Sequence, residues 1–162
     1  MAIIVPNGVS APSGSLVQRT STWTFVAGTT GAVAAHTVFT ITGRVFVDLI
    51  TAFCTTTLTS GGTPAITLGS ASDLDGFLLA PTGGAPGIVA NDWWLTAVTP
   101  QLVGGPTSVV TGGTVTSARY KVLAEDIVLD IPVATVTGGV LVFDVWYTPI
   151  TSGAGLAVTT PA

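Results

Sequence analysis

The residues able to do acid-base or nucleophilic chemistry are few, and histidine is the rarest of them. His36 is the single histidine of the chain, so a metal centre built from several imidazoles is impossible within one copy. A catalytic triad would need His36 beside a serine on a sharp turn, and no Gly-x-Ser-x-Gly pattern occurs. Phosphate-binding and dinucleotide-binding glycine motifs are also missing. We therefore expect a non-enzymatic chain with no metal or other cofactor, and we expect His36 at the surface or at a loop end.

Two carboxylates interrupt stretches that are otherwise apolar. Asp48 lies in Val-Phe-Val-Asp-Leu-Ile, and Asp144 lies in Val-Leu-Val-Phe-Asp-Val-Trp-Tyr. A buried carboxylate is unfavourable unless it is paired. We expect each to contact Arg44, Arg119 or a backbone amide, with a role in the fold or in an interface. Two carboxylates in one cleft would instead suit glycoside hydrolysis, and with eight acidic residues in the chain this enzyme alternative stays open.

A further acidic segment, Ser-Asp-Leu-Asp-Gly at residues 72–76, resembles the start of a calcium-binding loop. The Phe-Leu-Leu-Ala that follows supplies none of the further oxygen ligands that such a loop needs. We therefore predict a turn closed by the aspartate side chains. The single cysteine, Cys54, lies in an apolar run, so we predict a small buried side chain without a disulfide partner.

The best candidate for recognition is Asn-Asp-Trp-Trp at residues 91–94, next to a loop rich in Gly and Pro. Tryptophan is enriched in the energetically dominant parts of interfaces, and it can also stack on sugar rings. Adjacent residues of a strand point to opposite faces, so one tryptophan should enter the core while the other meets a loop or a neighbour. The predicted partner-contacting residues are Asn91, Asp92, Trp93 and Trp94, with Pro6 and Pro12 of the N-terminal segment.

The elements that must position these residues are β-strands almost throughout. Thr, Val and Ile dominate, and Gly-Gly pairs separate the apolar runs, as in antiparallel hairpins. We predict an all-β antiparallel sandwich or jelly roll over residues 16–151, with extended arms at 1–15 and 152–162. Residues 80–87 and 99–106 should be surface loops. The expected strands are 16–26, 36–42, 45–58, 65–69, 77–79, 93–98, 115–123, 127–131 and 140–148.

Composition restricts the partners. The chain is 48% hydrophobic but only 7% charged, and its mean hydropathy is +0.72. Its best apolar run is about half the length of a spanning helix, so we expect no membrane. With four Lys and Arg and a net charge of −4, we expect no nucleic acid. Apolar residues fall on both faces of the strands at 45–58 and 140–148, which predicts a second packing surface and self-association, commonly as a trimer or larger ring.

Several segments together resemble small β-rich virion proteins of tailed bacteriophages. They are His-Thr-Val-Phe-Thr-Ile-Thr-Gly-Arg-Val at 36–45, Thr-Thr-Leu-Thr-Ser-Gly-Gly-Thr-Pro at 56–64, residues 72–76, and Val-Trp-Tyr-Thr-Pro-Ile at 145–150. The resemblance covers roughly residues 36–150. It implies a virion component made in the host cytoplasm, of the capsid decoration or cement type, often a homotrimer on the major capsid protein.

Two other classes of function remain beside that interpretation. A tail tube or fibre protein would share the same composition. A carbohydrate- or receptor-binding β-sandwich module would use Asn91, Asp92 and Trp94 on a loop, and it predicts an exposed aromatic side chain and an affinity for sugar.

Overall fold

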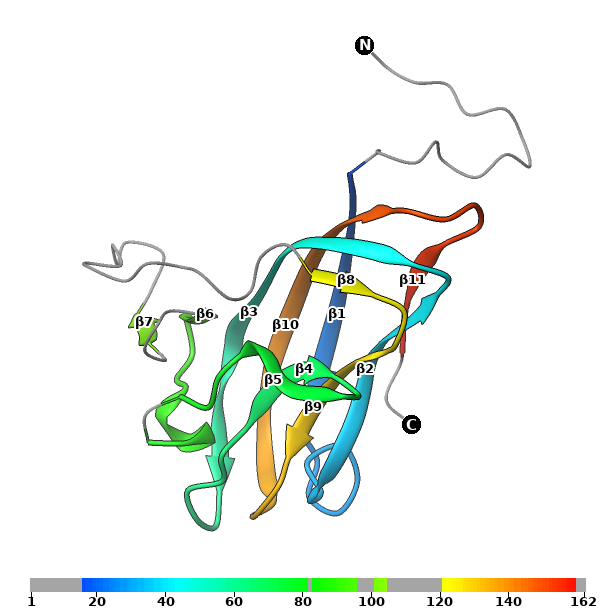
Figure 1. Ribbon diagram of the computed structural model, residues 1–162. Helices are drawn as coiled ribbons and strands as arrows, with labels where there is room; N and C mark the ends of the chain where they lie inside the picture. The colour runs from blue at the N-terminus through cyan, green and yellow to red at the C-terminus, as the bar shows by residue number, and fades with distance from the viewer. Residues whose placement is uncertain (1–15, 82, 96–100, 105–120, 160–162) are drawn as a thin grey trace.

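The computed structural model describes residues 16–81, 83–95, 101–104 and 121–159 (Figure 1). Two antiparallel β-sheets pack against each other, which confirms the predicted all-β fold. Within the described ranges, the one helical element is a short 3-10 turn, η1 at Ala85–Gly87. In the same ranges, no helix is long and apolar enough to cross a membrane.

The larger sheet, here sheet A, has the strand order β1-β10-β3-β6-β7, and β8 pairs with β3 beside this path. Its strands are β1 (Val17–Thr24), β3 (Val45–Ser60), β6 (Asp92–Leu95), β7 (Gln101–Gly104), β8 (Lys121–Leu123) and β10 (Val136–Pro149). The long strands β3 and β10 form its centre, and they are the apolar segments that the sequence marked as the strongest strands.

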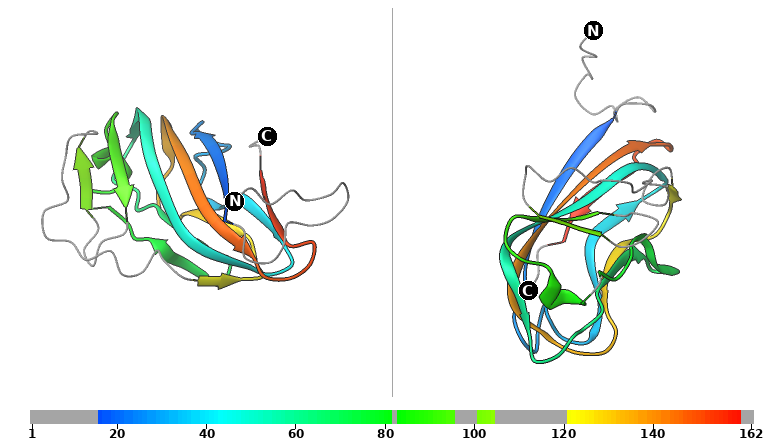
Figure 2. Two further views of the ribbon diagram at one scale, coloured as in Figure 1. Left: turned by 90° about the horizontal axis from the view of Figure 1, so that it is seen from above. Right: turned by 90° about the vertical axis from the view of Figure 1, so that its left-hand side faces the viewer.

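The smaller sheet, sheet B, has the order β11-β2-β9-β4-β5. Its strands are β2 (Ala34–Thr42), β4 (Thr67–Ser70), β5 (Asp73–Leu78), β9 (Ile127–Ile131) and β11 (Gly155–Val158). Figure 2 shows the two sheets as separate layers when the molecule is seen from above. Strands β1 and β11 are therefore edge strands of their two sheets, and the chain alternates between the sheets along its length.

The core lies between the sheets and follows from the alternation of each strand. In β10, Leu141, Phe143, Val145 and Tyr147 are buried, while the residues between them are partly exposed. Facing side chains come from sheet B, including Leu129 on β9. Burying a side chain of this size stabilises the fold by about 1.5–3 kcal/mol, so the inward rows of β3, β9 and β10 hold the two sheets together.

A glycine fixes the irregular end of the β3–β10 pair. Gly139 has a φ of +112°, and a Cβ placed there would lie 2.8 Å from the Cα of Leu58. The strand register shifts before, across and after this point, between Val136 and Gly138, between Gly138 and Val140 and between Val140 and Leu141. A side chain at position 139 would therefore push β10 away from β3.

Three sequence predictions about elements are corrected. The aspartates of 72–76 lie mostly in β5 rather than in a turn, because Asp73 pairs with Ser70 and the buried Leu78 pairs with Leu68. The predicted loop at 99–106 contains β7, whose backbone pairs with β6. The predicted C-terminal arm contains β11, which pairs with β2. The predicted N-terminal arm, with Pro6 and Pro12, lies outside the described residues.

Candidate functional site

Two of the predicted contact residues are part of the core. Trp94 is completely buried, and its indole N–H donates a 2.9 Å hydrogen bond to the carbonyl of Leu79. Asp92 is 6% exposed, and its carboxylate accepts a 3.0 Å bond from the backbone N–H of Val89, which closes the turn before β6. Both side chains are held within the fold of this chain and are not exposed at its surface, and their contact with a partner or a glycan stays a prediction.

The other two residues of that motif lie at the surface. Trp93 points to the opposite face from Trp94 and is half-buried, and its ring lies 4.8 Å from the ring of Phe53 at an angle of 46°. Asn91 is exposed with a φ of 74°. The predicted division of the tryptophans between two faces is confirmed, and Trp93 is the one available for a contact.

Trp93 belongs to a larger apolar surface on the outside of sheet A. We call this surface the outer face; its apolar members are Phe46, Leu49, Phe53, Trp93, Leu95, Val122, Val142 and Trp146. Cross-strand pairing makes it continuous, because Leu49 lies opposite Trp146 and Phe53 lies opposite Val142. These side chains are partly exposed, and Val122 is 60% exposed. The second packing surface expected from the two-sided strands is therefore this face.

The outside of sheet B can be compared with the outer face of sheet A. Its paired strands β2, β9 and β4 place no aromatic side chain there; the outward residues at two successive levels are Ala35, Thr37, Thr67, Gly69, Val128 and Asp130. Gly69 and Val128 are buried, and the Asp73 carbonyl oxygen would lie 1.9 Å from a Cβ at Gly69, so β5 covers part of this side. The outward aromatic side chains of the paired strands are thus on sheet A, while other exposed apolar side chains, such as Val33 and Val133, lie outside the strands.

The outer face is crossed by a polar row. Asp144 lies between Thr20 on β1 and Thr51 on β3. Its Oδ1 accepts hydrogen bonds from Thr20 Oγ1 and, at 3.2 Å, from Gln18 Nε2. Asp48 lies on the same sheet and accepts a 3.4 Å bond from Thr148 Oγ1.

Of the predicted partners of these carboxylates, Arg44 and a backbone amide are not among the described donors. Hydroxyl and side-chain amide groups hold Asp144 and Asp48, and the described hydrogen bonds of Arg44 are made by its backbone, whose N–H donates to Thr151 Oγ1 and whose carbonyl accepts from the Ile150 N–H. Threonines are the nearest cross-strand neighbours on this sheet, so they reach the carboxylates first. Arg119 lies outside the described residues.

His36 and Cys54 both contact neighbouring residues of the fold. The His36 ring lies 5.7 Å from that of Trp23, and its Nε2 is 2.9 Å from the carbonyl oxygen of Ala32. Cys54 is buried as predicted. Burial, followed by the nearby Asp92 carboxylate, raises the pKa of the Cys54 thiol to about 11. Among the described residues, no group of three His, Cys, Asp or Glu side chains could hold a metal ion.

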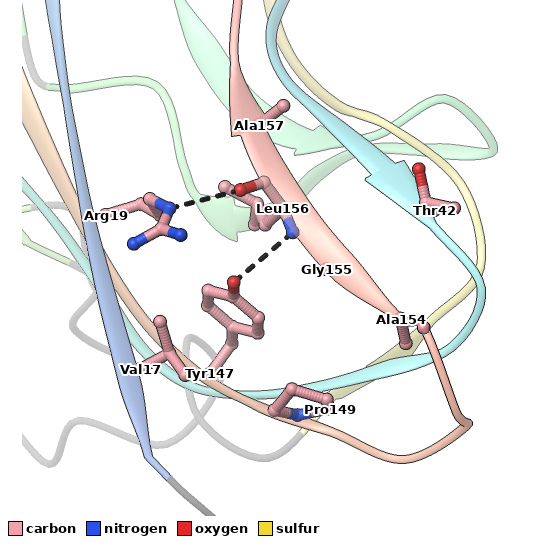
Figure 3. A pocket seen from close by; sticks show the side chains of 10 residues that line it. Val17, Arg19, Thr42, Tyr147, Pro149, Ala154, Gly155, Leu156 and Ala157 are labelled. Atoms are coloured by element: carbon pink, nitrogen blue, oxygen red, sulfur yellow. Dashed lines mark hydrogen bonds between the residues drawn. The ribbon is translucent and has the colours of Figure 1, made fainter. Parts of the chain in front are cut away.

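Sequence reasoning missed a cavity of about 460 Å³ at the open side of the sandwich (Figure 3). It lies between the edge strands β1 and β11. Arg19 Nε donates a 3.3 Å bond to the Leu156 carbonyl, and Tyr147 Oη accepts a 3.3 Å bond from the Leu156 N–H. These side chains satisfy the edge of β11 and connect the two sheets. The signal in the sequence was Arg19, the one charged residue of β1.

A solved structure is similar to this chain in its fold. No family model matches the chain, and no curated protein matches it. A solved chain described as "Cyanophage Pam1 capsid asymmetric unit" is similar over 92% of this chain and 94% of that chain, with 19% sequence identity and a TM-score of 0.48. A likeness at this level does not establish a function.

Proposed function

We propose that this chain is a structural component of a bacteriophage virion, of the capsid decoration or cement type, with a non-catalytic role. The observation that carries the proposal is the outer face of sheet A, where aromatic and aliphatic side chains gather while the paired outer positions of β2, β4 and β9 hold no aromatic side chain. A surface of this kind favours contact with another protein. The low charge of the whole chain and its sequence resemblance to small virion proteins agree with that role.

The dimensions of the outer face suit a lattice contact. The four strands that carry it, β3, β6, β8 and β10, have 16, 4, 3 and 14 residues. With a rise of about 3.3 Å per residue and strands about 4.8 Å apart, they cover roughly 600 Å². A standard stable interface buries about 800 Å² on each partner. One such contact is modest by itself, but many copies on a repeating shell act together, because each bound contact raises the effective concentration of the next.

The occupants that we propose for this face are a second copy of the chain, in a ring such as a trimer, and the major capsid protein or another virion subunit. Tail tube or fibre proteins are built on the same principle and form the nearest alternative. A glycan-binding module is the second candidate, and the half-exposed pair of Trp93 and Phe53 favours it, because two such rings could stack on a sugar.

Light scattering on the purified chain tests the proposal. We expect the wild-type mass to be a multiple of 16.2 kDa, most simply three. Trp93→Lys should reduce the measured mass to that of a single copy, because a charge on the outer face opposes burial there. Thr40→Lys, an exposed position on the outside of sheet B, is the matched control and should leave the mass unchanged. Thermal unfolding should show that both variants fold.

Two outcomes would overturn the proposed assembly. One is a wild-type chain that is monomeric at all concentrations, and the other is a wild-type oligomer that Trp93→Lys leaves intact. Binding of the monomer to immobilised glycans, lost in Trp93→Ala, would then favour the glycan-binding function.

A further inference from the structure

The polar row on the outer face lies between two apolar rows. Asp144 pairs with Thr51 on β3 and with Thr20 on β1. On one side of this row lie Leu49 and Trp146, and on the other side lie Phe53 and Val142. Toward β1 the neighbours of Asp144 are the polar Gln18 and Thr20, so this carboxylate lies where the apolar side chains of β3 and β10 meet a polar edge strand.

This row has hydrogen-bonding capacity that the described residues do not fill. Both bonds to Asp144 reach Oδ1, and Oδ2 has no hydrogen-bond partner among the described residues. Thr51 is 8% exposed, and its buried hydroxyl likewise has no partner. An unpartnered buried polar group is unfavourable, because it loses its hydrogen bonds to water without replacing them. Such a group commonly marks a place where a water molecule or a ligand completes the bonding.

We propose that this row is a socket for a basic side chain, an arginine or a lysine that projects from an otherwise apolar partner surface. The inference rests on the proposed function, since it takes the outer face to be a docking surface. The cation donates to Asp144 Oδ2 and adds a polar neighbour beside Thr51, while its aliphatic stem packs along Trp146 and Phe53.

Charge complementarity indicates this partner chemistry. Asp48 and Asp144 are the charged side chains on the described part of the outer face, and both are acidic. If two copies met through this same face around a two-fold axis, both would contribute carboxylates and neither a described cation. Like charges facing each other are destabilising. The partner surface is therefore different from this face, as in a head-to-tail ring or a contact with another subunit.

The test uses the chain at a dilution at which light scattering shows single copies, with N-acetyl-arginine amide as the probe and the side-chain N–H signals of the four tryptophans as the readout. Titration should shift the Trp146 signal selectively, and the N-acetyl-citrulline amide, which has nearly the same shape but no charge, should not. Asp144→Asn keeps the Oδ1 acceptor and replaces Oδ2 with a donor. It should weaken probe binding by roughly tenfold, as expected for loss of a charge-assisted hydrogen bond.

Two variants separate the socket from general effects. Asp130→Asn removes a carboxylate from the outside of sheet B and should leave probe binding unchanged. Thr51→Val removes the unpartnered hydroxyl and should raise thermal stability while weakening probe binding. Equal shifts with the citrulline amide, or unchanged binding in Asp144→Asn, would overturn the socket. Those results would leave the oligomer mass untouched, so the socket can fail while the proposed function stands.

Discussion

At the scale of single residues, the carboxylates of this chain are held by hydroxyl, amide and backbone donors. Asp126 Oδ1 accepts a 2.9 Å bond from the Ile41 N–H, and Asp92 accepts from the Val89 N–H. Glu125 accepts from Ser72 Oγ, and that bond is the largest cause of the lowered pKa of Glu125. In a chain with four Lys and Arg but many threonines and serines, carboxylates find neutral donors first. This leaves the acidic groups of the outer face available to a cation from elsewhere.

Cys54 supports a prediction about pH at the same scale. Burial raises the pKa of its thiol from 9.0 to about 11. The folded chain then holds the thiol proton more tightly than the unfolded chain. The resulting stability is complete below pH 9 and is lost as the pH rises toward 11. We expect the free energy of unfolding, measured with urea at several pH values, to fall over that range in the wild type. For Cys54→Ala the free energy of unfolding should fall less over the same range. Parallel curves for the variant and the wild type would contradict the prediction.

At the scale of elements, strands with long apolar runs could be predicted from the sequence, because such runs indicate burial by themselves. β3 and β10 are long apolar runs, and their ends lie within a few residues of the predicted ones. β11 could not be predicted from its own residues, Gly-Leu-Ala-Val. It pairs with β2 on one edge, and its other edge is bonded by Arg19 and Tyr147, which come earlier in the chain. Trp93 and Trp94 could be assigned to opposite faces by alternation, but which of them is buried depends on the sheet that β6 joins.

The attachment of β11 leads to a prediction about that element. Tyr147 Oη is the acceptor for the Leu156 N–H, and Arg19 bonds the Leu156 carbonyl. Tyr147→Phe removes the acceptor with little change in packing, so the Leu156 amide should exchange its hydrogen about fivefold faster, as for a net bond of about 1 kcal/mol. Arg44→Met is the control and should not change this rate, because the described hydrogen bonds of Arg44 are made by its backbone. Unchanged exchange in Tyr147→Phe would show that β2 alone holds β11.

At the scale of the whole molecule, the two outer sheet surfaces differ in their large side chains. They come from the same alternation rule applied to different strands. The outward positions of β3 and β10 carry Phe, Leu, Val and Trp beside a polar row, and those of β2 and β9 carry Thr, Ala, Asp and the buried Val128. Other exposed apolar side chains, such as Val33 and Val133, lie outside the strands. The core, the outer face and these scattered side chains together account for the apolar composition.

Assembly through that surface should respond to temperature as apolar contacts do. Burial of apolar area weakens on cooling and is strengthened by sulfate. We therefore expect the oligomer to dissociate at a severalfold higher concentration at 4 °C than at 30 °C, and sulfate to restore it in the cold; light scattering over a dilution series measures both. The single cation in the proposed socket is shielded from salt by its surroundings, so sodium chloride should have a smaller effect. An oligomer that is stable in the cold but dissociates in moderate sodium chloride would show that exposed charges, and not the outer face of sheet A, hold the copies together.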